Sequence, residues 1–220
     1  MPPISISFRR HAQKTKDGSK LTNKGKTDTI TIAKDMSEST KIYSSIENRT
    51  KETSDILKIF TRSEYQTRLK NILRGHKYFS GKRIRTTKKD SLLTYFKEIS
   101  EKIGISDAYI IKIWLSGKFP KKIIPKPEII ADEIIKDRFR VPNRIKETDK
   151  SIIFENITHD VVIAALFQRL SGERYHYQFK DLPKELESLR IDLNKDGKAI
   201  MQFRNYKKDI TERLNEILTN

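Results

Sequence analysis

Basic and imidazole side chains follow three predicted strands at the point where each strand ends. They are Arg10 and His11 after residues 4–9, Arg49 shortly after residues 41–45, and His159 after residues 150–158. The carboxyl ends of parallel strands lie along one edge of a sheet, so His11 and His159, 148 positions apart (159 − 11), are expected to meet there. Guanidinium groups offer paired N–H donors that match phosphate oxygens, and a helix beginning near His159 adds its positive end. The pattern therefore predicts a site that holds a phosphoryl group.

The elements that must position these residues alternate between strand and helix. A strand over residues 4–9 precedes a helix capped by Thr22, and a strand over 41–45 precedes a helix over 49–60. This order is typical of a parallel α/β sheet. We therefore expect an α/β fold of three layers, α/β/α, with a mostly parallel central sheet. Within its strand, Arg9 is expected to face outward by alternation.

Residues 62–150 have a different character. They contain three helical runs separated by glycine and proline signals. We expect this stretch to be a helical insertion that caps the pocket, within one domain that spans residues 1–220. The strand pattern then returns at residues 150–158, and a β-hairpin with its turn at residues 194–197 precedes a closing helix.

Several short motifs occur in the order that is known from one enzyme family. They are FRRHAQKT, LTNKGKTDTITIAKDM, KIYSSIENRTKETSDIL and ENITHDVVIAALF, and they cover roughly residues 4–60 and 150–172. Together they resemble the histidine phosphatase superfamily, which has the phosphoglycerate mutase-like fold. In that family a strand runs into Arg-His-Gly, Leu-Thr-x-x-Gly opens a helix, a Ser-Ser segment precedes an arginine, and a late strand ends in a histidine before an apolar helix.

The resemblance implies a role for each charged residue of the predicted site. His11 would be the nucleophile that becomes phosphorylated, and Arg10, Arg49 and His159 would hold the phosphoryl group. Such a chain would be a phosphomonoester hydrolase that needs no metal or cofactor, with a mutase less expected. The residue types suit this chemistry, because a neutral imidazole nitrogen can attack phosphorus and fixed cations stabilise the charge of the transition state.

The leaving oxygen also needs a proton donor. By resemblance the donor is Asp160, as in the acid-phosphatase branch, or Glu64, as in the mutase branch, with Asp160 preferred. The chain departs from the family at three places. Ala12 replaces the glycine of Arg-His-Gly, Ile46 replaces the proline of Ser-Ser-Pro, and Asp160 and Val161 stand where glycines commonly follow the second histidine.

The charge balance also points to an anionic partner. The chain has 220 residues with 46 Lys and Arg against 29 Asp and Glu, a formal net charge of +17. The expected partner is a phosphorylated small molecule or a phosphoprotein. The chain has no cysteine, no apolar run long enough to span a bilayer and no secretory signal pattern, so we expect neither a disulfide nor a membrane span, and a cytoplasmic location.

Two alternatives remain open at this point. Residues 95–122 also fit a basic helix-turn-helix with Gly104 in the turn, which would make the chain a nucleic-acid-binding protein. The supposed recognition helix is, however, loaded with apolar residues such as Ile110 and Trp114, which leaves few polar side chains for base edges. The second alternative is a catalytically inactive relative that only binds phosphate.

Overall fold

The computed structural model of the chain describes residues 4–37, 39–63, 65–74, 92–119, 125–140 and 151–220. In chain order its elements are β1 (Ile4–Arg10), α1 (Asn23–Lys34), β2 (Thr40–Ser44), α2 (Asn48–Phe60), β3 (Arg68–Leu69), η1 (Asn71–Arg74), α3 (Leu92–Ile103), α4 (Asp107–Leu115), α5 (Pro127–Phe139), β4 (Ile152–Thr158), α6 (Asp160–Ser171), α7 (Tyr175–Gln178), β5 (Ser188–Leu193), β6 (Ala199–Phe203), β7 (Tyr206–Asp209) and α8 (Thr211–Thr219).

The strands form one mixed sheet of seven strands in the order β3-β2-β4-β1-β5-β6-β7. The first four of these are parallel, and β5, β6 and β7 add an antiparallel edge. In the register of the central pair, Arg10 lies opposite Thr158. The residues that follow β1 and β4 are therefore neighbours at the carboxyl edge. The predicted α/β class with a mostly parallel centre is confirmed.

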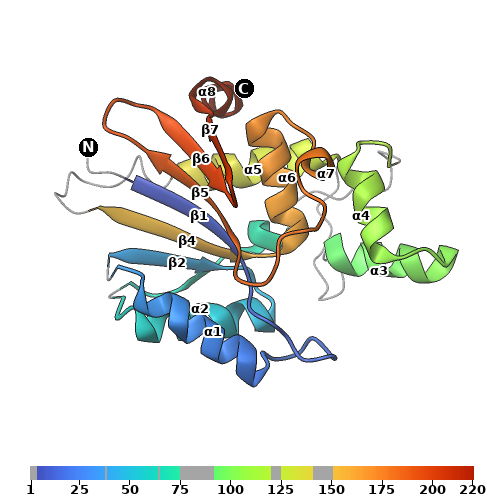
Figure 1. The fold of residues 1–220 in the computed structure, drawn as a ribbon, viewed down its shortest axis with the longest axis horizontal. Coiled ribbons are helices and arrows are strands. Elements are labelled where there is room, and N and C mark those ends of the chain that lie inside the picture. Colours follow the sequence, from blue (N-terminus) through green and yellow to red (C-terminus); the bar gives the residue numbers. More distant parts are fainter. Residues whose placement is uncertain (1–3, 38, 64, 75–91, 120–124, 141–150) are drawn as a thin grey trace.

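Helices cover both faces of the sheet (Figure 1). On one face, α1 and α2 bury a small core whose members are Ala33, Ile42, Leu57 and Ile157. On the other face, α6 is buried along most of its length against β1, β5 and β6, and α5 and α8 pack beside it. The strands β1 and β4 therefore lie inside a three-layer arrangement, which fixes where their ends can lie.

The start of α1 shows how local sequence shapes the loop after β1. Thr22 is the N-cap, and its side chain accepts a hydrogen bond from the N–H of Gly25, as the sequence predicts. Gly25 packs so closely on this loop that an added Cβ would lie 2.4 Å from the carbonyl oxygen of Gln13. The glycine thus lets the helix press against the chain two residues beyond His11.

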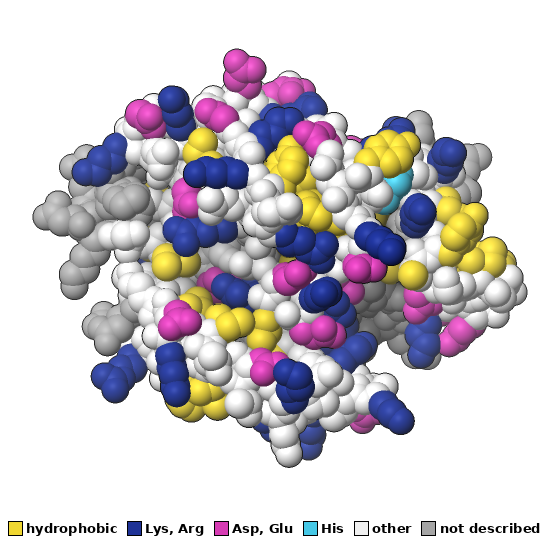
Figure 2. Space-filling model, in the orientation of Figure 1, with side chains coloured by type: hydrophobic (Ala, Val, Ile, Leu, Met, Phe, Trp, Pro, Cys, Tyr) yellow, Lys and Arg dark blue, Asp and Glu magenta, His cyan; other side chains and the backbone are white. Residues whose placement is uncertain are grey.

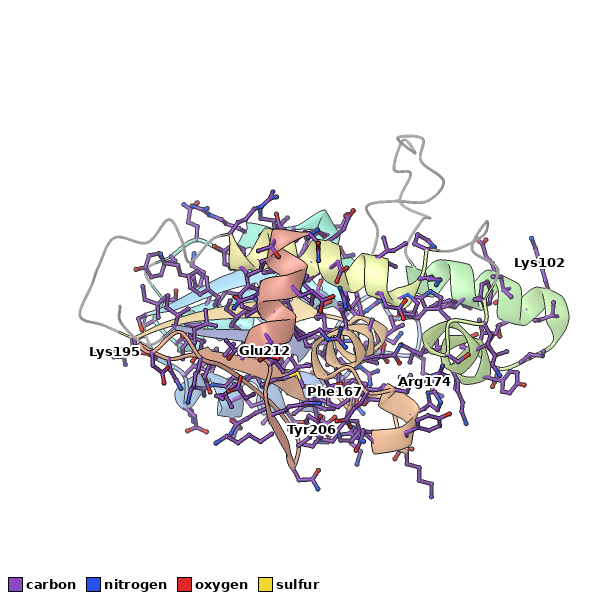
Figure 3. All side chains as sticks on the ribbon, turned by 90° about the horizontal axis from the view of Figure 1, so that it is seen from above. Lys102, Phe167, Arg174, Lys195, Tyr206 and Glu212 are labelled. Carbon is purple, nitrogen blue, oxygen red and sulfur yellow. The ribbon has the colours of Figure 1, made fainter. Side chains whose placement is uncertain are left out.

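The segment predicted as an insertion contributes helices α3, α4 and α5 together with the short strand β3, which pairs with β2. Helix α5 packs along α6, whereas α3 and α4 project from one end of the molecule (Figure 1). Seen from above, Lys102 on α3 and Lys195 in the β5–β6 turn lie at opposite ends of the molecule (Figure 3). The cap boundaries at residues 62 and 150 stay a prediction.

Helix α4 is anchored by its apolar residues. Trp114 is 1% exposed, and its ring packs against that of Phe96 at a tilt of 60° with the centroids 5.5 Å apart. Its indole N–H donates to the carbonyl of Pro125 at 2.8 Å. Its neighbours Ile110, Ile111 and Leu115 are also buried. The apolar face of α4 therefore belongs to the core. Within the described part of the chain, no helix is both long enough and apolar enough to cross a membrane.

Candidate active site

His11 directly follows β1 and is almost fully buried, with 4% of its surface exposed. Its backbone N–H donates to the carbonyl of Thr158 at 3.1 Å, which ties the end of β1 to the end of β4. In the side chain, Nδ1 lies 2.7 Å from the carbonyl oxygen of Ala12. A carbonyl oxygen only accepts, so Nδ1 carries the proton and Nε2 presents its lone pair.

The charge state of His11 is set by its surroundings. Burial lowers the pKa of its imidazole from 6.5 to about 3. The hydrogen bond to the Ala12 carbonyl opposes this effect, and the positive charges of Arg49, Arg10 and Lys14 add to it. The ring is therefore neutral near pH 7. A neutral imidazole nitrogen held in this way is available as a nucleophile.

Arg49, in the first turn of α2, lies between the two imidazoles. Its Nε–H donates to Nε2 of His11 at 3.1 Å, and its Nη2 lies 3.5 Å from Nδ1 of His159. The centroids of the two rings are 5.4 Å apart, with the ring planes at 71°. One guanidinium thus contacts a ring nitrogen of each histidine.

His159 is the N-cap of α6 and is 2% exposed. Its Nε2 lies 3.3 Å from the hydroxyl of Ser45, which in turn lies 2.7 Å from the hydroxyl of Thr50. Because a guanidinium only donates, Nδ1 of His159 is the acceptor toward Arg49 and Nε2 is the donor toward Ser45. The two histidines therefore hold opposite tautomers, and both lone pairs face the same guanidinium.

Arg10, the last residue of β1, is held beside this group by oxygen atoms from two later segments. Its Nη1 donates to the carbonyl of Pro183 at 2.6 Å, and its Nη2 lies 3.2 Å from Asp160 and 3.6 Å from Glu185. Its Nε is buried and has no hydrogen-bond partner among the described residues. Asp160 also accepts the N–H of Val161 at 2.8 Å, at the start of α6.

Comparisons with known proteins bear on this arrangement. No protein-family model and no curated protein matches the sequence. Solved structures do match. A phosphoglycerate mutase from Bacillus anthracis str. Sterne is 15% identical with a TM-score of 0.57, and the match covers 98% of this chain and 97% of that one. YhfR of Bacillus stearothermophilus is 14% identical with a TM-score of 0.61, covering 91% of this chain and 96% of that one. A phosphoserine phosphatase from Entamoeba histolytica, solved with 3-phosphoglyceric acid, is 13% identical with a TM-score of 0.57, covering 92% and 98%.

The chain has the phosphoglycerate mutase-like fold. The resemblance inferred from short motifs is therefore confirmed at the level of the fold. Within the phosphoglycerate mutase-like fold of this chain, the structure brings His11, Arg49 and His159 into mutual contact at the carboxyl edge of the sheet. It places Arg10 and Asp160 together as an ion pair beside them. The other predicted proton donor, Glu64, lies outside the described residues.

Arg9 lies on the face that alternation predicts, but its side chain is only 14% exposed, so the prediction that it faces outward is wrong. Its Nε lies 3.0 Å from a carboxylate oxygen of Glu155, and its Nη1 donates to the carbonyl of Leu186 at 2.8 Å. Glu155 is 1% exposed and also accepts the hydroxyl of Ser7 at 3.0 Å. Alternation gives the correct face for Arg9, but the neighbouring strand β4 supplies a buried carboxylate there and the loop before β5 covers it.

Two hydroxyl groups at the site were not predicted from the sequence. Ser45 contacts His159, and Thr53 accepts the N–H of Ala12 at 3.1 Å. Both are fully buried. The signal for Ser45 was present in the Ser-Ser segment before Arg49. Thr53 lies within the helix predicted over residues 49–60, and its contact with Ala12 arises from the packing of α2 on the loop after β1.

Lys14 adds a further cation at the rim, three residues beyond His11. An isolated bridge to Leu21 fixes its backbone. Although much of its surface is exposed, desolvation is the largest influence on its pKa and lowers it; Arg49 lowers it further, while Asp160 opposes this. The rim is therefore positive on the side of the β1–α1 loop. Among the described residues, no group of three or more His, Asp and Glu side chains is placed to hold a metal ion.

Proposed function

We propose that the chain is a metal-independent phosphomonoester hydrolase that works through a phosphohistidine on His11. The observation that carries the proposal is the contact of Arg49 with a ring nitrogen of each of two buried imidazoles, 3.1 Å to His11 and 3.5 Å to His159. Such a cluster of N–H donors around one nucleophilic nitrogen suits a tetrahedral oxyanion. Hydrolysis is proposed rather than a mutase reaction, and the nature of the substrate's organic part stays open between small molecules and a phosphoprotein.

In the first proposed step, Nε2 of His11 attacks phosphorus and the ester P–O bond breaks. Before this attack, the Nε–H of Arg49 must leave Nε2, whose lone pair it occupies, and donate to a phosphoryl oxygen. This exchange is favourable, because a charged oxygen is a stronger acceptor than a neutral imidazole nitrogen. Arg10, whose Nη2 lies 3.2 Å from Asp160, would supply the second guanidinium to another phosphoryl oxygen. In the next step, water attacks phosphorus, the P–N bond breaks and inorganic phosphate leaves.

The leaving oxygen takes its proton from Asp160 in the preferred version and from Glu64 in the alternative. Asp160 forms an ion pair with Arg10 at 3.2 Å. A bound phosphoryl group would compete with Asp160 for the same guanidinium. The two candidate donors are separated by measuring Asp160→Asn and Glu64→Gln on esters with good and poor leaving groups. Only loss of the true donor should make the rate depend steeply on the leaving group.

The nucleic-acid alternative has less support. The face of α4 that would enter a groove is occupied by core residues such as Trp114 and Ile110. Figure 2 shows Lys and Arg scattered over the visible face among Asp and Glu, without a single basic stripe. A DNA-binding surface of the usual kind gathers its cations along one element. If the chain bound DNA, its affinity would fall steeply with salt and would survive the His11→Asn change.

The test of the proposed function is hydrolysis of p-nitrophenyl phosphate in the presence of EDTA. The wild type should be active, and His11→Asn should fall to the background of the assay. His176→Asn is the matched control, because it removes an imidazole from α7, outside the site. An alkaline quench followed by intact-protein mass spectrometry should detect one added phosphoryl group in the wild type only. Tight vanadate binding without turnover would instead identify an inactive phosphate-binding relative.

A further inference from the structure

Four hydrogen bonds join the predicted nucleophile and the predicted clamp into a closed ring. Arg49 donates from Nε to His11 Nε2 at 3.1 Å, and His11 donates from Nδ1 to the carbonyl of Ala12 at 2.7 Å. The N–H of Ala12 donates to the hydroxyl of Thr53 at 3.1 Å. The hydroxyl of Thr53 donates to the carbonyl of Arg49 at 2.8 Å, which returns the ring to its start. In each of these four hydrogen bonds, the donor and the acceptor are defined.

The side chain of Thr53 joins the backbone of α2 directly to the backbone of the loop after β1. Thr53 and Ala12 are both 0% exposed, so neither group has water as a substitute partner. A hydroxyl that bonds the carbonyl four residues earlier in its own helix has its proton direction fixed. Its lone pairs are then directed outward, and the N–H of Ala12 meets one of them.

The position of the Ala12 carbonyl in turn determines the tautomer of His11. The carbonyl of Ala12 keeps the proton on Nδ1 and so leaves the lone pair on Nε2. If this carbonyl rotated away, Nδ1 would lose its acceptor and the proton could move to Nε2, where it would block attack on phosphorus. Anchoring the Ala12 N–H therefore stabilises the form of the ring that can react.

We propose that Thr53 is a positioning residue: its hydroxyl fixes the chain at Ala12, and through it the orientation and tautomer of His11. The inference rests on the proposed function, because a fixed tautomer affects turnover only if His11 is the nucleophile. A purely structural hydroxyl would contribute to stability alone. The same helix offers that case in Ser54, which is also fully buried but donates only to the carbonyl of Lys51, at 2.7 Å.

The experiment compares Thr53→Val, Thr53→Ser and the control Ser54→Ala. Valine keeps the shape and removes the hydroxyl, so kcat should fall roughly 10- to 100-fold with little change in KM, the cost expected for a reacting group displaced by a fraction of an ångström to an ångström. Thr53→Ser keeps the hydroxyl, so its kcat should stay within about threefold of the wild-type value. A threefold change corresponds to about 0.7 kcal/mol of activation free energy. Ser54→Ala should leave kcat within the same limit, whatever it does to the thermal midpoint.

A second measurement reads the ring directly and needs no activity. In 15N spectra of selectively labelled histidine, wild-type His11 should show a protonated Nδ1 and an unprotonated Nε2, and Thr53→Val should move both nitrogens toward averaged values. The proposal is overturned if wild-type His11 carries its proton on Nε2, or if folded Thr53→Val keeps both the wild-type kcat and the wild-type spectrum. A wild type that shows the expected tautomer but hydrolyses no phosphomonoester would refute the proposed function while leaving the positioning ring intact.

Discussion

Acid should destabilise this protein through His11 in particular. Burial depresses the pKa of His11 to about 3 in the folded state, whereas the unfolded chain has the ordinary value of 6.5. Between these two values the unfolded state binds a proton that the folded state does not bind, so the free energy of unfolding falls as the pH drops below 6.5. The loss continues until the pH reaches about 3, where both states are protonated.

The size of the effect follows from the same two values. At pH 4.5, two units below the unfolded pKa and well above the folded one, the loss relative to pH 7.5 is about 3 kcal/mol. The full loss at still lower pH is about 5 kcal/mol. With a urea slope of roughly 2–3 kcal/mol per molar, the loss at pH 4.5 moves the unfolding midpoint by about 1 M.

The assay is urea unfolding at pH 7.5 and 4.5 of the wild type, His11→Asn and His176→Asn. Other groups titrate as well, so the informative quantity is the difference between the acid-induced losses of wild type and variant. His11→Asn should lose about 3 kcal/mol less than the wild type. The pKa of His176 is lowered mainly by partial burial. His176→Asn shows the effect of removing an imidazole outside the site, and its acid-induced loss of stability should differ less from that of the wild type. Equal losses in the wild type and His11→Asn would show that the His11 ring takes up its proton without penalty.

Four further predictions concern single substitutions. Arg49→Lys removes the forked donor between the two imidazoles, and kcat for p-nitrophenyl phosphate should fall by about 10²–10³-fold. Lys14→Gln removes a rim cation, and KM should rise a few-fold with a weaker dependence on ionic strength, measured in initial rates at two salt concentrations. Gly25→Ala drives a Cβ into the carbonyl of Gln13, which should lower stability by about 1–3 kcal/mol in a thermal melt. Glu155→Ala removes the carboxylate partner of the partly buried Arg9 guanidinium and should lower stability by about 3 kcal/mol in the same assay.

The sequence contained enough information for the fold and for the charged members of the site, because both depend on signals that repeat along the chain. His11 and His159 stand directly after predicted strands, and parallel strands bring such positions to one edge. Arg49 needed the motif as well, since it follows β2 by several residues and reaches the site from the first turn of α2.

Other features depended on contacts between elements that no local pattern records. Thr53 meets Ala12 only because α2 packs on the loop after β1, and Ser45 meets His159 only across neighbouring strands. The ion pair of Arg9 with Glu155 joins residues 146 apart in the chain. Strand alternation predicts the face of the sheet on which a side chain lies, but it does not predict which residue the side chain contacts there.

The position of β1 in the sheet affects how the chain can fold during its synthesis. This strand is made before the other strands of its sheet, yet its two hydrogen-bonded neighbours are β4 and β5, which end at Thr158 and Leu193. During synthesis both edges of β1 stay unpaired until these two strands have emerged. Pairing over such long sequence separations slows folding, and unpaired strand edges favour aggregation in the meantime.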